Sequence, residues 1–137
     1  MPDFVADASI CLAWCFPDES NPMTEALLDR LVQGEEIAVP CHWRLEVLNA
    51  VIQGEKRGRI SEPMAKGFLA RLLSFRIEID GRRELSHLET LRELAQRHRL
   101  TAYDAAYLEL AMRLGLPLAS LDGDLIRAAQ AEKVPLI

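Results

Sequence analysis

Four acidic residues, Asp7, Glu46, Asp104 and Asp122, have side chains and positions that suit shared metal chemistry. Asp7 ends an apolar run, and Asp122 follows a second short run at 117–120. The carboxyl ends of parallel strands lie at one edge of a sheet, so both aspartates are expected there. Carboxylate oxygens are the ligands that Mg²⁺ and Mn²⁺ prefer. An ion held by these acids would activate water and stabilise the departing oxygen of a phosphodiester.

Each of these acids also has a purely structural explanation. Asp7 can cap the helix that follows it, and Asp122 lies in an Asp-Gly-Asp sequence, which is typical of a turn into a helix. Asp104 is expected in the first turn of a helix, where a negative charge interacts well with the helix dipole. It nevertheless shares a face with Leu108, and a carboxylate on an apolar surface needs a partner or a metal. Glu46 on its own reads as a solvated glutamate.

The segments that would position these acids alternate between strands and helices. Expected strands cover 4–7, 37–39, 76–80, 117–120 and 134–137. Expected helices cover 9–16, a segment ended by Gly34, and then 43–56, 61–73, 85–98, 102–114 and 125–132. This order predicts an α/β fold of three layers, in which a central, mainly parallel sheet lies between helices.

Length and composition restrict the class of protein. A chain of 137 residues, half of them apolar, suits one globular domain over residues 1–137. No apolar run approaches the roughly 18 residues of a spanning helix, and Asp3 stands where a secretory signal would carry basic residues. We therefore expect a cytoplasmic protein without membrane contact. The three cysteines and three histidines show no zinc-like spacing.

Basic residues form local groups in a chain whose net charge is −5. That charge argues against indiscriminate nucleic-acid binding, but it allows a nuclease with metal-neutralised acids and grouped cations. Arg44 and the group Lys56, Arg57 and Arg59 are candidates for RNA contact. A second group covers 97–99. Both groups also fit the ends of helices, where positive charge is favourable.

The segments around the four acids resemble the motifs of a known nuclease family. They read Val5-Ala6-Asp7-Ala8-Ser9, Trp43-Arg44-Leu45-Glu46-Val47-Leu48-Asn49-Ala50, Leu100-Thr101-Ala102-Tyr103-Asp104-Ala105-Ala106-Tyr107 and Leu118-Ala119-Ser120-Leu121-Asp122. In order and spacing they are similar to the acidic motifs of PIN-domain nucleases. They look most like VapC, the toxin of VapBC toxin–antitoxin modules. The resemblance runs from residue 3 to the C-terminus.

The resemblance implies a PIN-like fold and a Mg²⁺- or Mn²⁺-dependent endoribonuclease that a VapB-type antitoxin inhibits. The catalytic set it implies is Asp7, Glu46, Asp104 and Asp122, of which Asp7, Asp104 and Asp122 would be metal ligands. Whether Glu46 contacts metal or only orients water stays open.

Three further residues have supporting places in the resemblance. Ser9 would be a polar helper beside the first acid. Ser120 stands where the family often has threonine, which keeps a hydroxyl. Asp124 is an extra acid near the same edge, and whether Asp122 or Asp124 lies closer to metal is open.

Two other functions compete with a ribonuclease. A Mg²⁺-binding phosphoacceptor signalling domain would need a lysine near the acids, and Lys56, Lys66 and Lys133 do not follow the strand pattern. A non-catalytic PIN-like binding module is the other alternative. Apolar residues at 12–16 and 68–73 exceed the expected needs of one small core. They predict a homodimer and a groove that an antitoxin helix covers.

Overall fold

A parallel sheet forms the centre of the protein, and the computed structural model describes residues 1–82 and 84–137. Its strands are β1 (Phe4–Ala6), β2 (Glu36–Val39), β3 (Arg76–Ile79) and β4 (Leu118–Ala119). They lie in the order β3-β2-β1-β4, and every pairing is parallel. Their carboxyl ends therefore share one edge, which we call the rim, and this confirms the predicted sheet.

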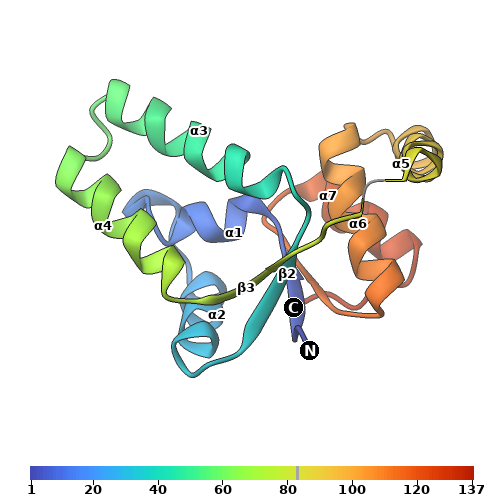
Figure 1. The fold of residues 1–137 in the computed structure, drawn as a ribbon, viewed down its shortest axis with the longest axis horizontal. Coiled ribbons are helices and arrows are strands. Elements are labelled where there is room, and N and C mark those ends of the chain that lie inside the picture. The colour runs from blue at the N-terminus through green and yellow to red at the C-terminus, as the bar shows by residue number, and fades with distance from the viewer. Residues whose placement is uncertain (83) are drawn as a thin grey trace.

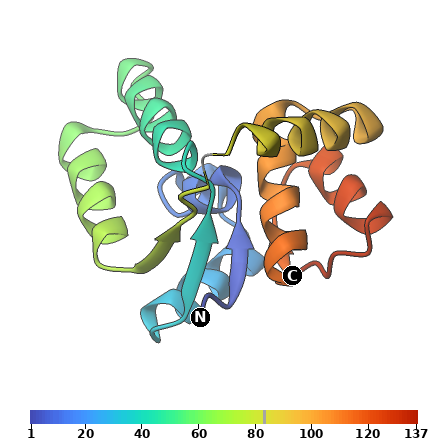
Figure 2. The same ribbon diagram turned by 45° about the vertical axis from the view of Figure 1, so that its right-hand side comes forward.

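Helices cover both faces of this sheet. They are α1 (Ala8–Ala13), α2 (Pro22–Val32), α3 (Trp43–Lys56), α4 (Glu62–Leu73), α5 (Leu85–His98), α6 (Ala102–Leu114) and α7 (Gly123–Ala131). Figures 1 and 2 show α3 and α4 on one side of the sheet and α5, α6 and α7 on the other. The predicted α/β/α arrangement of three layers is confirmed. No helix in the described ranges has the length and apolar character needed to cross a membrane.

Helix caps explain why the chain turns where it does. The Asn21 side chain accepts from the backbone N–H of Thr24, and the Asn21 backbone N–H donates to the Thr24 hydroxyl, which starts α2 with a capping box. Ser61 caps α4, and Thr101 caps α6. Gly115 ends α6 with φ +66°, a left-handed conformation that glycine adopts without steric cost. Each boundary therefore follows from a residue type that the sequence displays.

The core accounts for apolar residues that the sequence suggested were surplus. Phe16 is buried, while Leu12 and Trp14 are partly buried against the core. Gly54 in α3 makes this packing possible, since a Cβ there would lie 2.6 Å from the Phe16 ring. The prediction that 12–16 would be left over for a partner is therefore wrong. Residues 68–73 do leave Leu73 exposed.

Two element boundaries differ from expectation. The predicted strand at 134–137 is only an isolated bridge between Leu118 and Leu136. The predicted helix at 9–16 ends at Ala13, and a short 3₁₀ turn, Pro17–Glu19, follows it. In both places a proline restricts the backbone, since Pro17 and Pro135 cannot donate a backbone hydrogen bond.

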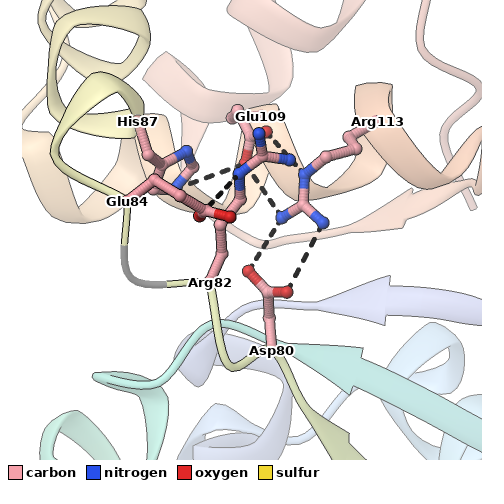
Figure 3. Close-up of polar contacts among 6 residues, drawn as sticks. All are labelled: Asp80, Arg82, Glu84, His87, Glu109 and Arg113. Atoms are coloured by element: carbon pink, nitrogen blue, oxygen red, sulfur yellow. Dashed lines mark hydrogen bonds and ion pairs between the residues drawn. The ribbon is translucent and has the colours of Figure 1, made fainter.

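A paired ionic cluster ties β3 to the α5–α6 helix pair (Figure 3). The Arg113 guanidinium lies 2.8 Å from both Asp80 and Glu109, and His87 lies 3.8 Å from Glu109. Hydrogen bonds to Glu109, and then to Asp80, raise the pKa of Arg113. We call these residues, Asp80, His87, Glu109 and Arg113, the Arg113 cluster. Both of its carboxylates therefore have a cationic partner within the protein.

Candidate active site

Asp7 lies at the centre of the rim, directly after β1, and is only 4% exposed. Its carboxylate accepts hydrogen bonds from the hydroxyls of Ser9 and Ser120, each at 2.5 Å. It also accepts from the backbone N–H of Ile10 and so caps α1. Burial raises the pKa of Asp7, and these hydrogen bonds offset part of that rise. The cap and the polar helpers foreseen from the sequence therefore occur together at one carboxylate.

Asp104 faces Asp7 from the first turn of α6. Its backbone N–H donates to the capping hydroxyl of Thr101, and a hydrogen bond to Thr101 also acts on its carboxylate. The pKa of Asp104 lies above its ordinary value of 3.8, first because of burial and then because of the charges on Asp122, Asp7 and Glu46. That repulsion shows that the structure brings all four predicted acids into one electrostatic environment. We call them the acid cluster.

Glu46 is held by an aromatic group that sequence reasoning missed. The Tyr107 hydroxyl donates to Glu46 Oε1 at 2.9 Å, across 61 residues of sequence. His42 Nε2 lies 2.8 Å from the same oxygen, without the alignment that a hydrogen bond requires. The His42 ring also packs against Tyr107 and Tyr103, with centroids 5.2 and 5.3 Å away. Tyr107 is fully buried, so Glu46 is attached to a rigid part of α6.

The two remaining acids have different surroundings. Asp122 is half-buried and caps α7 by accepting from the N–H of Leu125, while its own N–H donates to Ser120. Asp124 is exposed and pairs with Arg127 at 2.7 Å. Asp122 therefore belongs to the acid cluster, whereas Asp124 lies in a solvated ion pair on the outside of α7.

Comparison with known proteins agrees with this geometry. The PIN domain family profile matches residues 4–131. Ribonuclease VapC3 of Pyrobaculum aerophilum is 32% identical over 136 residues, which cover 97% of this chain and 95% of the relative. The chain belongs to the VapC ribonucleases of the PIN-domain family. Ribonuclease VapC12 of Mycobacterium tuberculosis is 32% identical over 103 residues, which cover 75% and 77% of the two chains.

A solved structure supports the same fold for this VapC-type chain. The crystal structure of PAE2754 from Pyrobaculum aerophilum superposes with a TM-score of 0.71 at 27% identity. The match covers 98% of this chain and 83% of the other. The resemblance drawn from the acidic motifs is therefore confirmed for family and fold.

The donor set of the PIN domain fits a hard divalent cation, although the carboxylates shown are turned to protein partners. Every side chain of the acid cluster offers oxygen alone, as Mg²⁺ and Mn²⁺ require. In the described ranges, no three Asp, Glu, His or Cys side chains converge closely enough to hold an ion. The Asp7 carboxylate accepts hydrogen bonds from hydroxyls, and Glu46 accepts one from Tyr107. Asp122 accepts one from a backbone N–H in the first turn of α7.

The basic residues of the PIN domain lie at different distances from the rim. Arg44, in the first turn of α3, lines a cleft of about 290 Å³ together with Cys41, Asp80 and Arg82. Lys56 and Arg57 end α3, about 20 Å further along this helix. Arg59 is engaged structurally, because it pairs with Asp18 at 2.9 Å and stacks over Phe16 at 4.0 Å. Of the predicted RNA contacts, only Arg44 lies in the first turn of α3, two residues before Glu46.

Proposed function

We propose that this chain, folded as one PIN domain over residues 1–137, is a metal-dependent endoribonuclease toxin of a type II toxin–antitoxin module. The observation that carries the proposal is the acid cluster and its lack of compensation. Within residues 1–82 and 84–137, no lysine or arginine forms an ion pair with Asp7, Glu46, Asp104 or Asp122. Uncompensated, partly buried carboxylates at a strand rim are expected to be neutralised by a ligand.

We assign Asp7, Asp104 and Asp122 as ligands of Mg²⁺ or Mn²⁺, as the choice of donors favours. Such an ion supplies charge neutralisation, activation of water and stabilisation of the departing oxygen of a phosphodiester. Ser9 and Ser120 hold the Asp7 carboxylate in place. Glu46, oriented by Tyr107, can accept a proton from the attacking water or position that water. The related proteins named ribonucleases support RNA as the substrate.

The alternative of a phosphoacceptor domain gains no support from the placement of the lysines. Lys66 pairs with Glu62 in α4, Lys56 ends α3 and Lys133 follows α7. None of these positions follows a strand of the sheet, where such a domain needs its lysine.

Cleavage of a labelled oligoribonucleotide tests the proposed activity. Asp7→Asn and Asp104→Asn keep the shape of each side chain and remove its charge, so both are expected to abolish Mg²⁺- or Mn²⁺-dependent cleavage. Glu89→Gln is the control, because Glu89 is an exposed acid on α5 that is already paired with Arg92, and it is expected to leave cleavage unchanged. Cleavage at the wild-type rate by both Asp7→Asn and Asp104→Asn would contradict the proposal.

A VapB-type antitoxin is the partner we propose, docked in an apolar groove beside α4. The groove has a volume of about 360 Å³ and is lined by Trp43, Leu69, Leu72, Leu73, Phe75, Ile77 and Ile79. Leu73 is 88% exposed there, and an amphipathic helix suits such a groove. Co-expression of Leu73→Asp with the antitoxin is expected to reduce complex recovery. Unchanged recovery would place the antitoxin elsewhere.

A homodimer is also proposed, but on different residues from those the sequence suggested. The outer face of α3 exposes Leu45, Leu48 and Ile52, which are spaced by three and four residues. This spacing forms one apolar stripe along a helix. Light scattering at micromolar concentration is expected to show a dimer that Leu48→Glu dissociates.

Cytoplasmic localisation stays a prediction.

A further inference from the structure

A cationic cavity lies outside the acid cluster, between the end of α5 and the middle of α7. Its volume is about 480 Å³, and its lining is Arg97, His98, Arg99, Arg127, Ala128 and Ala131. The chain as a whole carries a net charge of −5. Cations from two elements therefore converge here against the overall charge, which calls for an explanation beyond a solvated surface.

Part of this charge is fixed in place by a well-covered carboxylate. Glu132 Oε1 lies 2.7 Å from Arg97 Nη1 and 2.9 Å from His98 Nε2. The hydrogen bond to His98, followed by the one to Arg97, lowers the pKa of Glu132, so this residue stays ionised and orients both side chains. Arg127 pairs with Asp124 in an exposed contact. Two carboxylates thus face three arginines and a histidine.

Arg99 supplies the uncompensated charge. Within residues 1–82 and 84–137 it forms no ion pair, and its side chain is exposed at the cavity. Its backbone is left-handed, with φ +55°, at the C-cap of α5. Glycine or asparagine is usual at such a position. An arginine there is disfavoured by its backbone and is free to bind an anion.

The cavity lies beside the acid cluster along two elements. Arg99 comes five residues before Asp104, just ahead of α6. Arg127 comes five residues after Asp122, which is about 7.5 Å along α7. Asp104 and Asp122 are themselves close enough for each charge to affect the other. An extended polyanion lying across the rim can therefore reach this cavity.

We propose that this cavity binds a backbone phosphate of the RNA substrate, on one side of the phosphodiester held at the acid cluster. The inference rests on the proposed ribonuclease function. Guanidinium groups bind phosphate through paired N–H donors and keep their charge at every working pH. Such a contact holds the strand in register without reading its bases. It also offsets the repulsion between RNA and the acids nearby.

RNA binding measured apart from cleavage tests the inference. Fluorescence anisotropy with a labelled oligoribonucleotide of about twelve nucleotides is performed on chains that also carry Asp7→Asn, so that the RNA stays intact. Arg99→Gln with Arg127→Gln is expected to weaken binding about tenfold and to reduce the slope of log K against log salt by about 1. Lys66→Gln with Arg71→Gln removes the same charge from α4, which lies on the other side of the sheet (Figure 1), and is expected to change affinity less than about twofold.

The outcomes separate this inference from the proposed function. Equal losses in the two double variants, or no loss in either, would overturn the cavity as a phosphate site. Hydrolysis of bis-p-nitrophenyl phosphate, which is too small to reach the cavity, is expected to be unchanged by Arg99→Gln with Arg127→Gln. Loss of that hydrolysis together with RNA binding would show that the cavity supports the fold instead. Selective loss of RNA binding, together with no RNA cleavage by the chain that retains Asp7, would leave the phosphate site standing and refute the ribonuclease function.

Discussion

Two groups of carboxylates lie near the carboxyl ends of the strands, and they differ in how their charge is balanced. In the Arg113 cluster, Asp80 and Glu109 flank one guanidinium at 2.8 Å (Figure 3). In the acid cluster, Asp7 receives only hydroxyl and amide hydrogen bonds, and Asp104 is surrounded by like charges. Burial is similar in both groups, so burial alone does not separate a structural acid from a functional one.

The difference shows which carboxylates need a positive charge from a bound ligand. A buried carboxylate without a cation destabilises the folded chain unless something neutralises it. The Arg113 cluster contains its own cation and needs nothing further. On the proposed function, the acid cluster leaves that role to a bound ion and is the site of chemistry, whereas the Arg113 cluster is a clamp between β3, α5 and α6.

The largest expected effect is the loss of activity on removing one charge from the acid cluster. Asp104→Asn is expected to lower the rate of RNA cleavage by on the order of 10²- to 10³-fold, because a ligand of the ion is lost. Asp80→Asn makes the same change in the Arg113 cluster and is expected to leave the rate per folded molecule within about twofold. Equal losses would remove the distinction between the clusters.

Breaking the clamp is expected to affect stability and not chemistry. Arg113→Met leaves Asp80 and Glu109 unpaired, and we expect chemical denaturation to show a loss of about 2–3 kcal/mol. Arg92→Met is the matched control, since Arg92 pairs with exposed Glu89 on the surface of α5, and its loss should leave the free energy of unfolding almost unchanged. Similar values for the two variants would mean that the clamp is an ordinary surface pair.

A smaller effect is expected from releasing Glu46. Tyr107→Phe keeps the buried ring and removes the hydroxyl that orients Glu46, so kcat should fall about tenfold with little change in KM. Tyr103→Phe removes an exposed hydroxyl from the same helix and should leave kcat unchanged. A rise in KM with unchanged kcat in Tyr107→Phe, or a tenfold fall of kcat in both variants, would show that Tyr107 does not position Glu46.

The smallest effect concerns pH in metal-free protein. Because the pKa of Asp104 is raised in the fold, its contribution to stability is complete below the ordinary value of 3.8 and is lost as pH rises through the raised pKa. Metal-free Asp104→Asn should therefore match the wild type near pH 3 and exceed it at pH 7 by up to about 1 kcal/mol, since solvent screens a half-buried carboxylate. Thermal unfolding in a chelator measures this difference. The opposite trend would mean that Asp104 has a stabilising partner.

Much of the fold is predictable because its boundaries depend on local residues. The cap Ser61, the stop at Gly115 and the apolar run before Asp7 each act within a few positions. The bridge at Leu136 was mistaken for a strand, because an apolar run alone does not show how many hydrogen bonds its neighbour can supply. The prediction that Phe16 is a surplus apolar residue is wrong, because the sequence does not show that Gly54 leaves space for the Phe16 ring.

The candidate site was predictable only in part, for a similar reason. Acids after strands are recognisable from the sequence, and so are serines next to them. The bond between Tyr107 and Glu46 joins residues that are 61 positions apart, and the clamp between Asp80 and Arg113 joins residues 33 apart. In the sequence, Tyr107 looks like an ordinary core residue, and Arg113 looks like an ordinary basic residue near the end of a helix. Only the structure, in which side chains of α6 reach Glu46 in α3 and Asp80 after β3, shows what they hold.

Calorimetric titration of Mn²⁺ into the wild type and into Asp104→Asn tests the central claim most directly. We expect the wild type to bind Mn²⁺ with measurable heat. Asp104→Asn is expected to show no such heat, and Asp80→Asn is expected to show the same heat as the wild type. A wild-type chain that binds no Mn²⁺, or an Asp104→Asn chain that binds it equally well, would contradict the claim that the acid cluster is left uncompensated for a metal ion.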